Sequence, residues 1–123
     1  MNLSSNVNFF LGLQMQLKIN HWQTKGYARH NAFGSTYNEL QDLVDTYVEE
    51  SMGKYGRFKL DDETKTITLS NLSELDMKGF INTVREALIQ ITKQVDETDT
   101  NLLNLRDEML GLINKLGYLL TLE

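Results

Sequence analysis

The fold of this chain depends most on the segment KINHWQTKGYARHNAF, residues 18–33. Upstream of its centre, apolar residues recur every three or four positions, a spacing typical of an α-helix with one buried face. This stripe consists of Phe10, Leu13, Leu17 and His21. Lys25 followed directly by Gly26 is a helix stop signal. The first helix is therefore predicted over residues 3–25.

A second apolar stripe runs beside the first one. It consists of Leu11, Met15, Ile19 and Trp22. The combined face is wide, which predicts burial against several neighbouring helices. Helical spacing resumes near Ala28 and continues to about Met52, before Gly53 and Gly56. Because the turn between these helices is only two or three residues long, the helices should be antiparallel.

Residues 57–69 interrupt the helical pattern. Two short segments, residues 57–60 and 66–69, each alternate polar and apolar side chains, and they flank the sequence DDET at positions 61–64. Alternation on both sides of a turn-like sequence predicts a small β-hairpin, with a disordered loop as the alternative.

The C-terminal half returns to helical spacing. Apolar residues recur from Met77 to Val95 and from Leu102 to Leu119, and Ser73 or Asp76 could cap the start of this region. The spacing permits one continuous helix or coiled coil through Thr98. The sequence DETDTN at positions 96–101 is poor in helix formers and rich in capping residues. A break there is favoured, which gives an all-α, antiparallel four-helix bundle in a single domain of residues 1–123.

Composition narrows the function. The chain has 123 residues, no cysteine and a net charge of −5 without a basic cluster. Nucleic-acid binding is not expected, because it requires a basic stripe or arm. No apolar run approaches the roughly 18 residues of a membrane helix, and no secretory signal is evident. We therefore expect a cytoplasmic protein. Any metal would be bound by oxygen and imidazole ligands, which suit iron, manganese or zinc.

Four side chains form a candidate ligand set. His21 lies near the end of the first helix, His30 near the start of the second, and Asp45 and Glu49 are neighbours four positions apart later in it. His30 and Asp45 are separated by roughly 22 Å along a helix. One chain cannot gather all four around one ion, whereas a twofold dimer with antiparallel second helices could.

The same segment resembles the ferroxidase region of the Dps miniferritins, over about residues 17–50. The matching positions are His21-Trp22, Lys25-Gly26, His30, Asp45 and Glu49. Small Dps-like proteins of tailed bacteriophages look most similar. The resemblance implies a ferritin-like fold and an oligomer that is at least a dimer, up to a dodecameric cage. It also implies iron at His21 with Asp45 and Glu49 of a second copy, His30 as an auxiliary ligand, and Trp22 near the metal.

This sequence departs from the Dps pattern at several points. Gly34 occupies the position where a carboxylate usually follows the second histidine by four residues. The lysine-rich N-terminal arm is absent, so DNA binding is not carried over. Two hypotheses follow. The first is an iron-binding oligomer with ferroxidase-type oxidation of Fe(II). The second is a structural or interaction scaffold, viral in origin and acting in the host cytoplasm, that has lost this chemistry.

Overall fold

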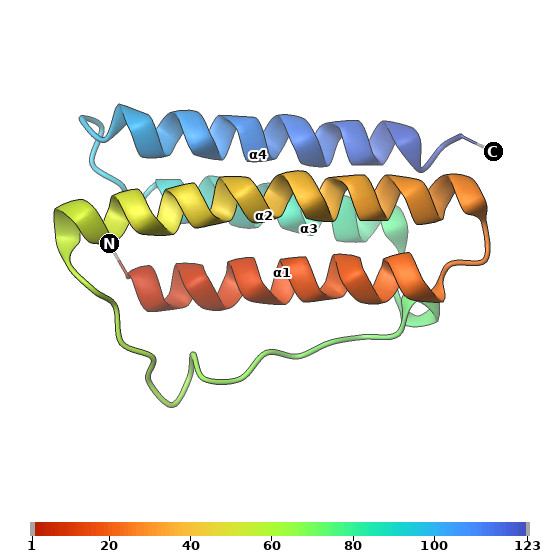
Figure 1. Cartoon of the computed structure of the whole chain (residues 1–123), viewed down its shortest axis with the longest axis horizontal. Coiled ribbons are helices and arrows are strands. Elements are labelled where there is room, and N and C mark those ends of the chain that lie inside the picture. Colours follow the sequence, from red (N-terminus) through yellow and green to blue (C-terminus); the bar gives the residue numbers. More distant parts are fainter. Residues whose placement is uncertain (1, 123) are drawn as a thin grey trace.

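The computed structural model describes residues 2–122 and contains four α-helices and one short 3₁₀ helix (Figure 1). The elements in chain order are α1 (Leu3–Gln23), α2 (Tyr27–Tyr55), η1 (Leu72–Glu74), α3 (Met77–Thr92) and α4 (Thr100–Leu119). The all-α, four-helix prediction is confirmed, and the boundaries of the first two helices differ from the predicted ones by a few residues.

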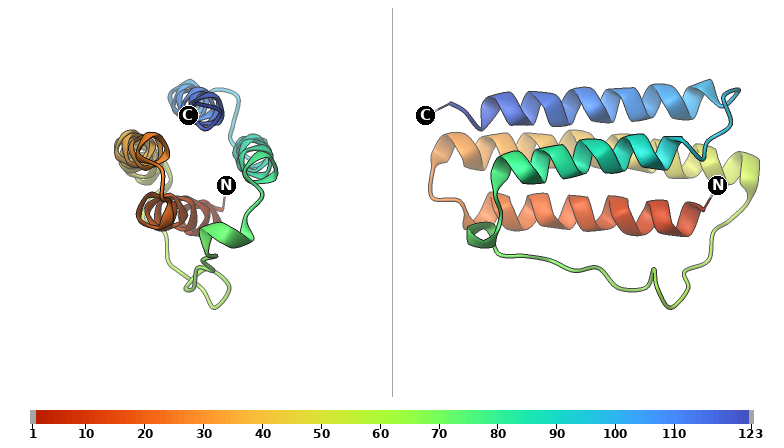
Figure 2. Two further views of the ribbon diagram at one scale, coloured as in Figure 1. Left: turned by 90° about the vertical axis from the view of Figure 1, so that its right-hand side faces the viewer. Right: turned by 180° about the vertical axis from the view of Figure 1, so that it is seen from behind.

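The helices are packed side by side around a common core. Contacts join α1 to α2, α2 to α4, and α3 to α4. Viewed end-on, the order around the bundle is α1, α2, α4, α3, and the chain directions show that neighbouring helices are antiparallel (Figures 1 and 2). It follows that α2 and α3 run in the same direction, so their connection has to cross the length of the bundle.

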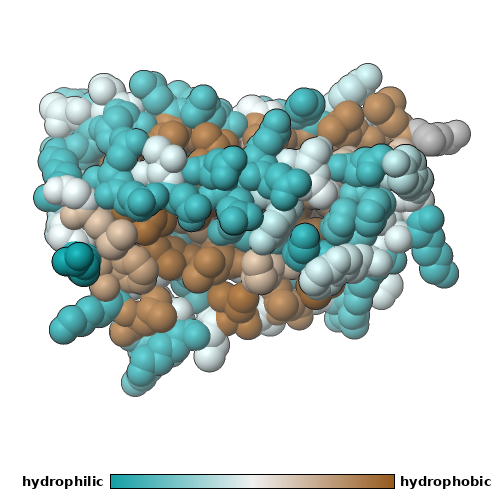
Figure 3. Space-filling model, viewed as in Figure 1, coloured by the Kyte–Doolittle hydropathy of each residue, from teal (hydrophilic) through white to brown (hydrophobic). Residues whose placement is uncertain are grey.

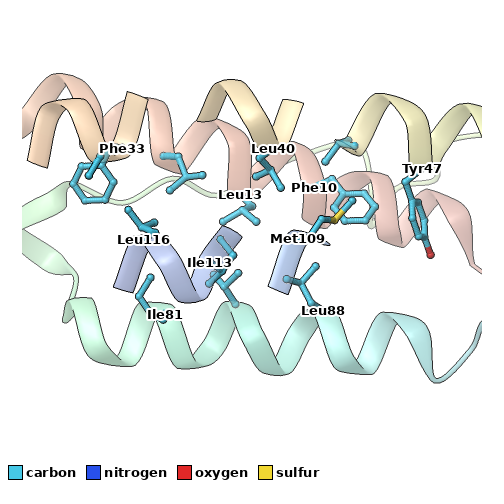
Figure 4. Close-up of a cluster of buried hydrophobic side chains, with 14 of the residues drawn as sticks. Phe10, Leu13, Phe33, Leu40, Tyr47, Ile81, Leu88, Met109, Ile113 and Leu116 are labelled. Atoms are coloured by element: carbon cyan, nitrogen blue, oxygen red, sulfur yellow. The ribbon is translucent and has the colours of Figure 1, made fainter. Parts of the chain in front are cut away.

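One apolar stripe from each helix forms the core (Figure 4). Phe10 and Leu17 of α1, Leu40 of α2 and Leu116 of α4 are all at most 1% exposed. Burial of each such side chain contributes about 1.5–3 kcal/mol. The Phe10 and Tyr47 rings pack edge to face with their centroids 5.2 Å apart. The first predicted stripe of α1 is therefore its core face.

The second stripe of α1 is not buried as predicted. Leu11 is 44% exposed and Trp22 is 65% exposed. The reason is tertiary: α2 packs closely on α1, whereas the opposite side of α1 is bordered by an irregular segment and η1 (Figure 2). Amphipathic periodicity identifies apolar faces, but it does not say whether a neighbouring helix covers each of them.

The predicted break between α3 and α4 is confirmed. Helix α3 ends at Thr92 and α4 begins at Thr100. The Asp96 carboxylate accepts a hydrogen bond from the backbone N–H of Thr98 at 2.8 Å. Such local bonds compete with helix formation, so the chain reverses here. The Asp76 carboxylate accepts from the N–H of Gly79 at 3.1 Å, so Asp76 is the N-cap of α3.

The β-hairpin predicted over residues 57–69 is wrong. Among residues 2–122 there is no β-strand, and residues 57–71 run along α1 as an irregular extended segment, here called the strap (Figure 1). A hairpin would return the chain to the end where α2 stops, but α3 begins at the opposite end. Helix α1 is about 32 Å long, and a strap in extended form spans up to about 50 Å. Only an extended path can make this connection.

Amide side chains of α1 bind the main chain of the strap. Gln16 donates to the carbonyl of Ser70 and accepts from its N–H, both at 2.9 Å. Asn8 donates to the carbonyls of Thr64 and Thr66 at 3.0 and 2.7 Å. These bonds replace those of a strand partner, so the strap is a loop, the alternative to the hairpin, and its contacts with α1 order it.

Gly56, which ends α2, has a φ of +89°, a conformation that L-residues rarely adopt. Gly53 lies within the helix, so α2 is a turn longer than the sequence suggested. None of the helices described in residues 2–122 is both long and apolar enough to cross a membrane.

Candidate functional site: the histidine pair and its surroundings

His21 and His30 meet at the connection between α1 and α2. The Nδ1 of His21 lies 2.7 Å from the main-chain oxygen of His30, and the Nδ1 of His30 lies 2.9 Å from that of His21. A carbonyl oxygen only accepts hydrogen bonds, so each Nδ1 carries a hydrogen and donates it. The rings stack with centroids 3.8 Å apart and planes 20° apart. The pair thus ties the end of α1 to the start of α2.

Gly34 provides the space for the His21 ring. A Cβ atom at this position would lie 2.8 Å from Cε1 and 2.9 Å from Nδ1 of His21. Carbon atoms normally approach to about 3.5–4.0 Å. By comparison with the Dps pattern, Gly34 was predicted to mark the loss of a carboxylate ligand. In the fold, any side chain at this position would collide with the ring, so close packing accounts for the glycine.

The other two predicted ligands lie far from the histidine pair. Asp45 and Glu49 are exposed on α2, with Asp45 roughly 22 Å from His30 along the helix. Within residues 2–122, no three His, Asp or Glu side chains gather in a way that could hold a metal. A site built from all four residues would therefore have to lie between two copies, as the spacing of His30 and Asp45 predicts.

Trp22, the predicted near-metal aromatic residue, points outward from α1. Its ring is 65% exposed and lies 5.4 Å from the Nζ of Lys18, which is also 4.6 Å from the centre of the Tyr37 ring. The lysine therefore bridges the two rings by cation–π contacts. Trp22 belongs to the surface around the histidine pair and not to the core.

Sequence reasoning missed a polar cluster at the opposite end of the bundle. Asp99, directly before α4, is 3% exposed and accepts hydrogen bonds from the Lys54 ammonium and the Tyr55 hydroxyl. The bonds from Lys54 and Tyr55 lower the pKa of Asp99 below its usual value of 3.8. The cluster anchors the α3–α4 turn to the end of α2. The capping residues at positions 96–101 predicted the turn. The partners of Asp99 were not predicted, because Lys54 and Tyr55 lie about 45 positions away in the sequence.

Tyr47 is close to this cluster and has a packing role. Its side chain is 1% exposed, and burial raises the pKa of its hydroxyl to about 12. The phenol is therefore neutral over the physiological pH range. Its edge-to-face contact with Phe10 makes Tyr47 part of the core.

Comparison with known proteins identifies the family. Residues 21–120 match the model of DUF5856, a family of unknown function, and the chain belongs to this family. It is 28% identical to the "Uncharacterized 14.6 kDa protein in mobD-ri intergenic region" of Enterobacteria phage T4, over 97% of this chain and 91% of the phage protein. The predicted similarity to phage proteins is confirmed as a distant relationship to this T4 protein. No solved structure matches the chain.

The assignment to the Dps miniferritins is wrong. The DUF5856 match includes His21, His30, Asp45 and Glu49, the positions on which the resemblance depended. The five matching features occupy a short window, and two of them, the histidines, have a hydrogen-bonding role in the fold. Each histidine bonds to the main chain of the other. Gly34, where the sequence departs from the Dps pattern, makes room for the His21 ring.

Proposed function

We propose that this member of the DUF5856 family is a non-catalytic helical assembly protein that associates with a second copy of itself. The contact surface is the α1–strap face, defined by Leu11, Ile67 and Leu69. These side chains are 44%, 39% and 43% exposed. Apolar surface gathers along α1 and the strap, below the polar surface of α2 (Figure 3). Contiguous exposed apolar surface marks interaction sites in soluble proteins, and this observation carries the proposal.

The charges of the strap favour a second copy as the occupant. Arg57, Lys59 and Lys65 balance an acidic cluster in the same segment, which consists of Asp61, Asp62 and Glu63. A twofold contact presents the same surface twice, so it requires a surface that complements itself. The net charge of −5 lies on the rest of the chain, where two copies would repel each other. The strap is a place where they can approach without net repulsion.

Sedimentation equilibrium of the wild type and two lysine variants tests this proposal. The wild type should be a dimer or larger at micromolar concentration, and Ile67→Lys should be monomeric. Ile89→Lys is the matched control, because Ile89 is 42% exposed but lies on α3; it should associate like the wild type. Circular dichroism establishes that each variant is folded. A monomeric wild type, or unchanged association of Ile67→Lys, would refute the proposal.

A second candidate function is metal binding between two copies. Both imidazoles donate through Nδ1 to a carbonyl, which leaves the lone pair on Nε2. Metal-binding histidines are commonly oriented by such a bond. His21 would bind iron, zinc or manganese together with Asp45 and Glu49 of a second copy, and His30 would assist. Calorimetric titration of Fe(II) or Zn(II) into wild type, His21→Ala and His30→Ala tests this. If His21→Ala binds the metal with the same affinity as the wild type, metal binding at this site is excluded.

A further inference from the structure

A cavity of about 480 Å³ lies between the start of α3, the last turns of α4 and the start of α2. Its apolar lining includes Ile81, Gly117 and Leu120, and Tyr118 lies at the same cavity with 63% of its surface exposed. Figure 2 shows α3 on this side of the bundle, away from the strap. The volume is within the range of about 300–1,000 Å³ found for small-molecule sites.

Three cations line this cavity, and no acidic residue does. They are Arg29, Lys78 and Arg85. The chain as a whole has 17 acidic and 12 basic residues. A cavity whose charged lining residues are all basic is therefore unexpected from the composition. In the part of the chain that the structure describes, the ion pairs involve Lys54, Lys65 and Arg106 and none of these three cations. Their positive charges are therefore not neutralised by side-chain carboxylates of residues 2–122.

Neutral groups hold the two guanidinium groups in place. Arg85 donates to the side-chain oxygen of Asn114 at 2.8 Å and to that of Asn82. Arg29 donates to the main-chain oxygen of Leu120 at 3.3 Å. These bonds position the cations without cancelling their charge, so an incoming anion would not have to displace a carboxylate. Guanidinium groups bind carboxylates and phosphates through paired hydrogen bonds.

The N-terminus of α3 is already capped by a side chain of the same segment. Asp76 already caps this helix by accepting from the N–H of Gly79. The anion would be bound by the three side chains, and the apolar lining would contact the rest of the ligand. We propose that this cavity binds a small organic anion, whose carboxylate or phosphate group pairs with Arg29, Lys78 and Arg85 and whose apolar body lies against Ile81 and Tyr118.

Nuclear magnetic resonance titration of the full chain at low salt tests this inference. The probes are phenyl phosphate, phenylacetate and the neutral 2-phenylethanol, and the readout is the movement of the amide signals of Ile81, Gly117 and Tyr118. At least one anion should bind at millimolar concentration, about tenfold or more tightly than the neutral compound. Comparing phenyl phosphate with phenylacetate shows which charged group the cavity prefers. Added salt should weaken binding.

Matched variants identify the residues responsible. Arg85→Gln and Lys78→Gln should each weaken anion binding about tenfold. Lys93→Gln, which removes an exposed cation outside the cavity, should bind like the wild type. Lys78 is exposed, so its variant remains informative if Arg85→Gln is unstable. The inference is wrong if neither anion binds, if the neutral compound binds equally well, or if both cavity variants bind like the wild type. Self-association through the α1–strap face involves other residues and is measured separately.

Discussion

Replacing Gly34 by alanine places a methyl group 2.8 Å from Cε1 of His21. At an unobstructed position inside a helix, replacing glycine by alanine stabilises the folded protein by about 1 kcal/mol, because alanine is the better helix former. At Gly34 the ring cannot move away freely, since it donates to the His30 carbonyl and stacks on the His30 ring. Overpacking of this kind costs roughly 1–3 kcal/mol. Gly34→Ala should therefore lower the free energy of unfolding by up to about 2 kcal/mol.

Gly111→Ala is the matched control, because Gly111 lies inside α4 with no atom within 4 Å of an added Cβ. It should stabilise by about 1 kcal/mol. In a His21→Ala background the ring is absent, so Gly34→Ala should become stabilising as well. Urea denaturation of the four proteins in this cycle gives a coupling energy between His21 and Gly34, expected at roughly 1–3 kcal/mol. Equal stabilisation by Gly34→Ala and Gly111→Ala in the wild-type background would refute the close-packing role of Gly34.

Three further predictions concern other parts of the bundle. The folded-state pKa of Asp99 is lowered, so its carboxylate stabilises the fold above the usual aspartate pKa and loses this effect as the pH falls through the lowered value. Urea denaturation should thus show Asp99→Asn less stable than wild type at pH 7, with a difference that narrows below the usual value of 3.8. Leu116→Ala removes a side chain with 0% exposure and should cost about 2–5 kcal/mol, whereas Ile89→Ala, at a 42% exposed position outside the α1–strap face, should change stability by about 0.5 kcal/mol or less. Gln16→Ala removes both bonds to Ser70, so the Ser70 amide should exchange hydrogen faster, with Gln41→Ala on the exposed face of α2 as the control.

The four helices and the turn between the last two could be predicted from the sequence alone. Both follow from local physics: apolar spacing repeats within each helix, and Asp76 and Asp96 bond to backbone groups only two or three residues away. The core stripe of α1 could be predicted for the same reason. The sequence singled out His21 and His30 as candidate ligands, but their contact with each other was not predicted.

The path of the strap and the contacts between the helices depend on the tertiary structure. The strap is extended because α2 and α3 run in the same direction, which no pattern within residues 57–69 reveals. The ring of His21 on α1 requires glycine at position 34 of α2. Asp99, in the turn before α4, binds Lys54 and Tyr55 of α2. The cations of the α3–α4 cavity come from two separate helices, α2 and α3. Such contacts depend on how the helices pack against one another. The residues involved are too far apart in the chain for a local sequence pattern to predict that they meet.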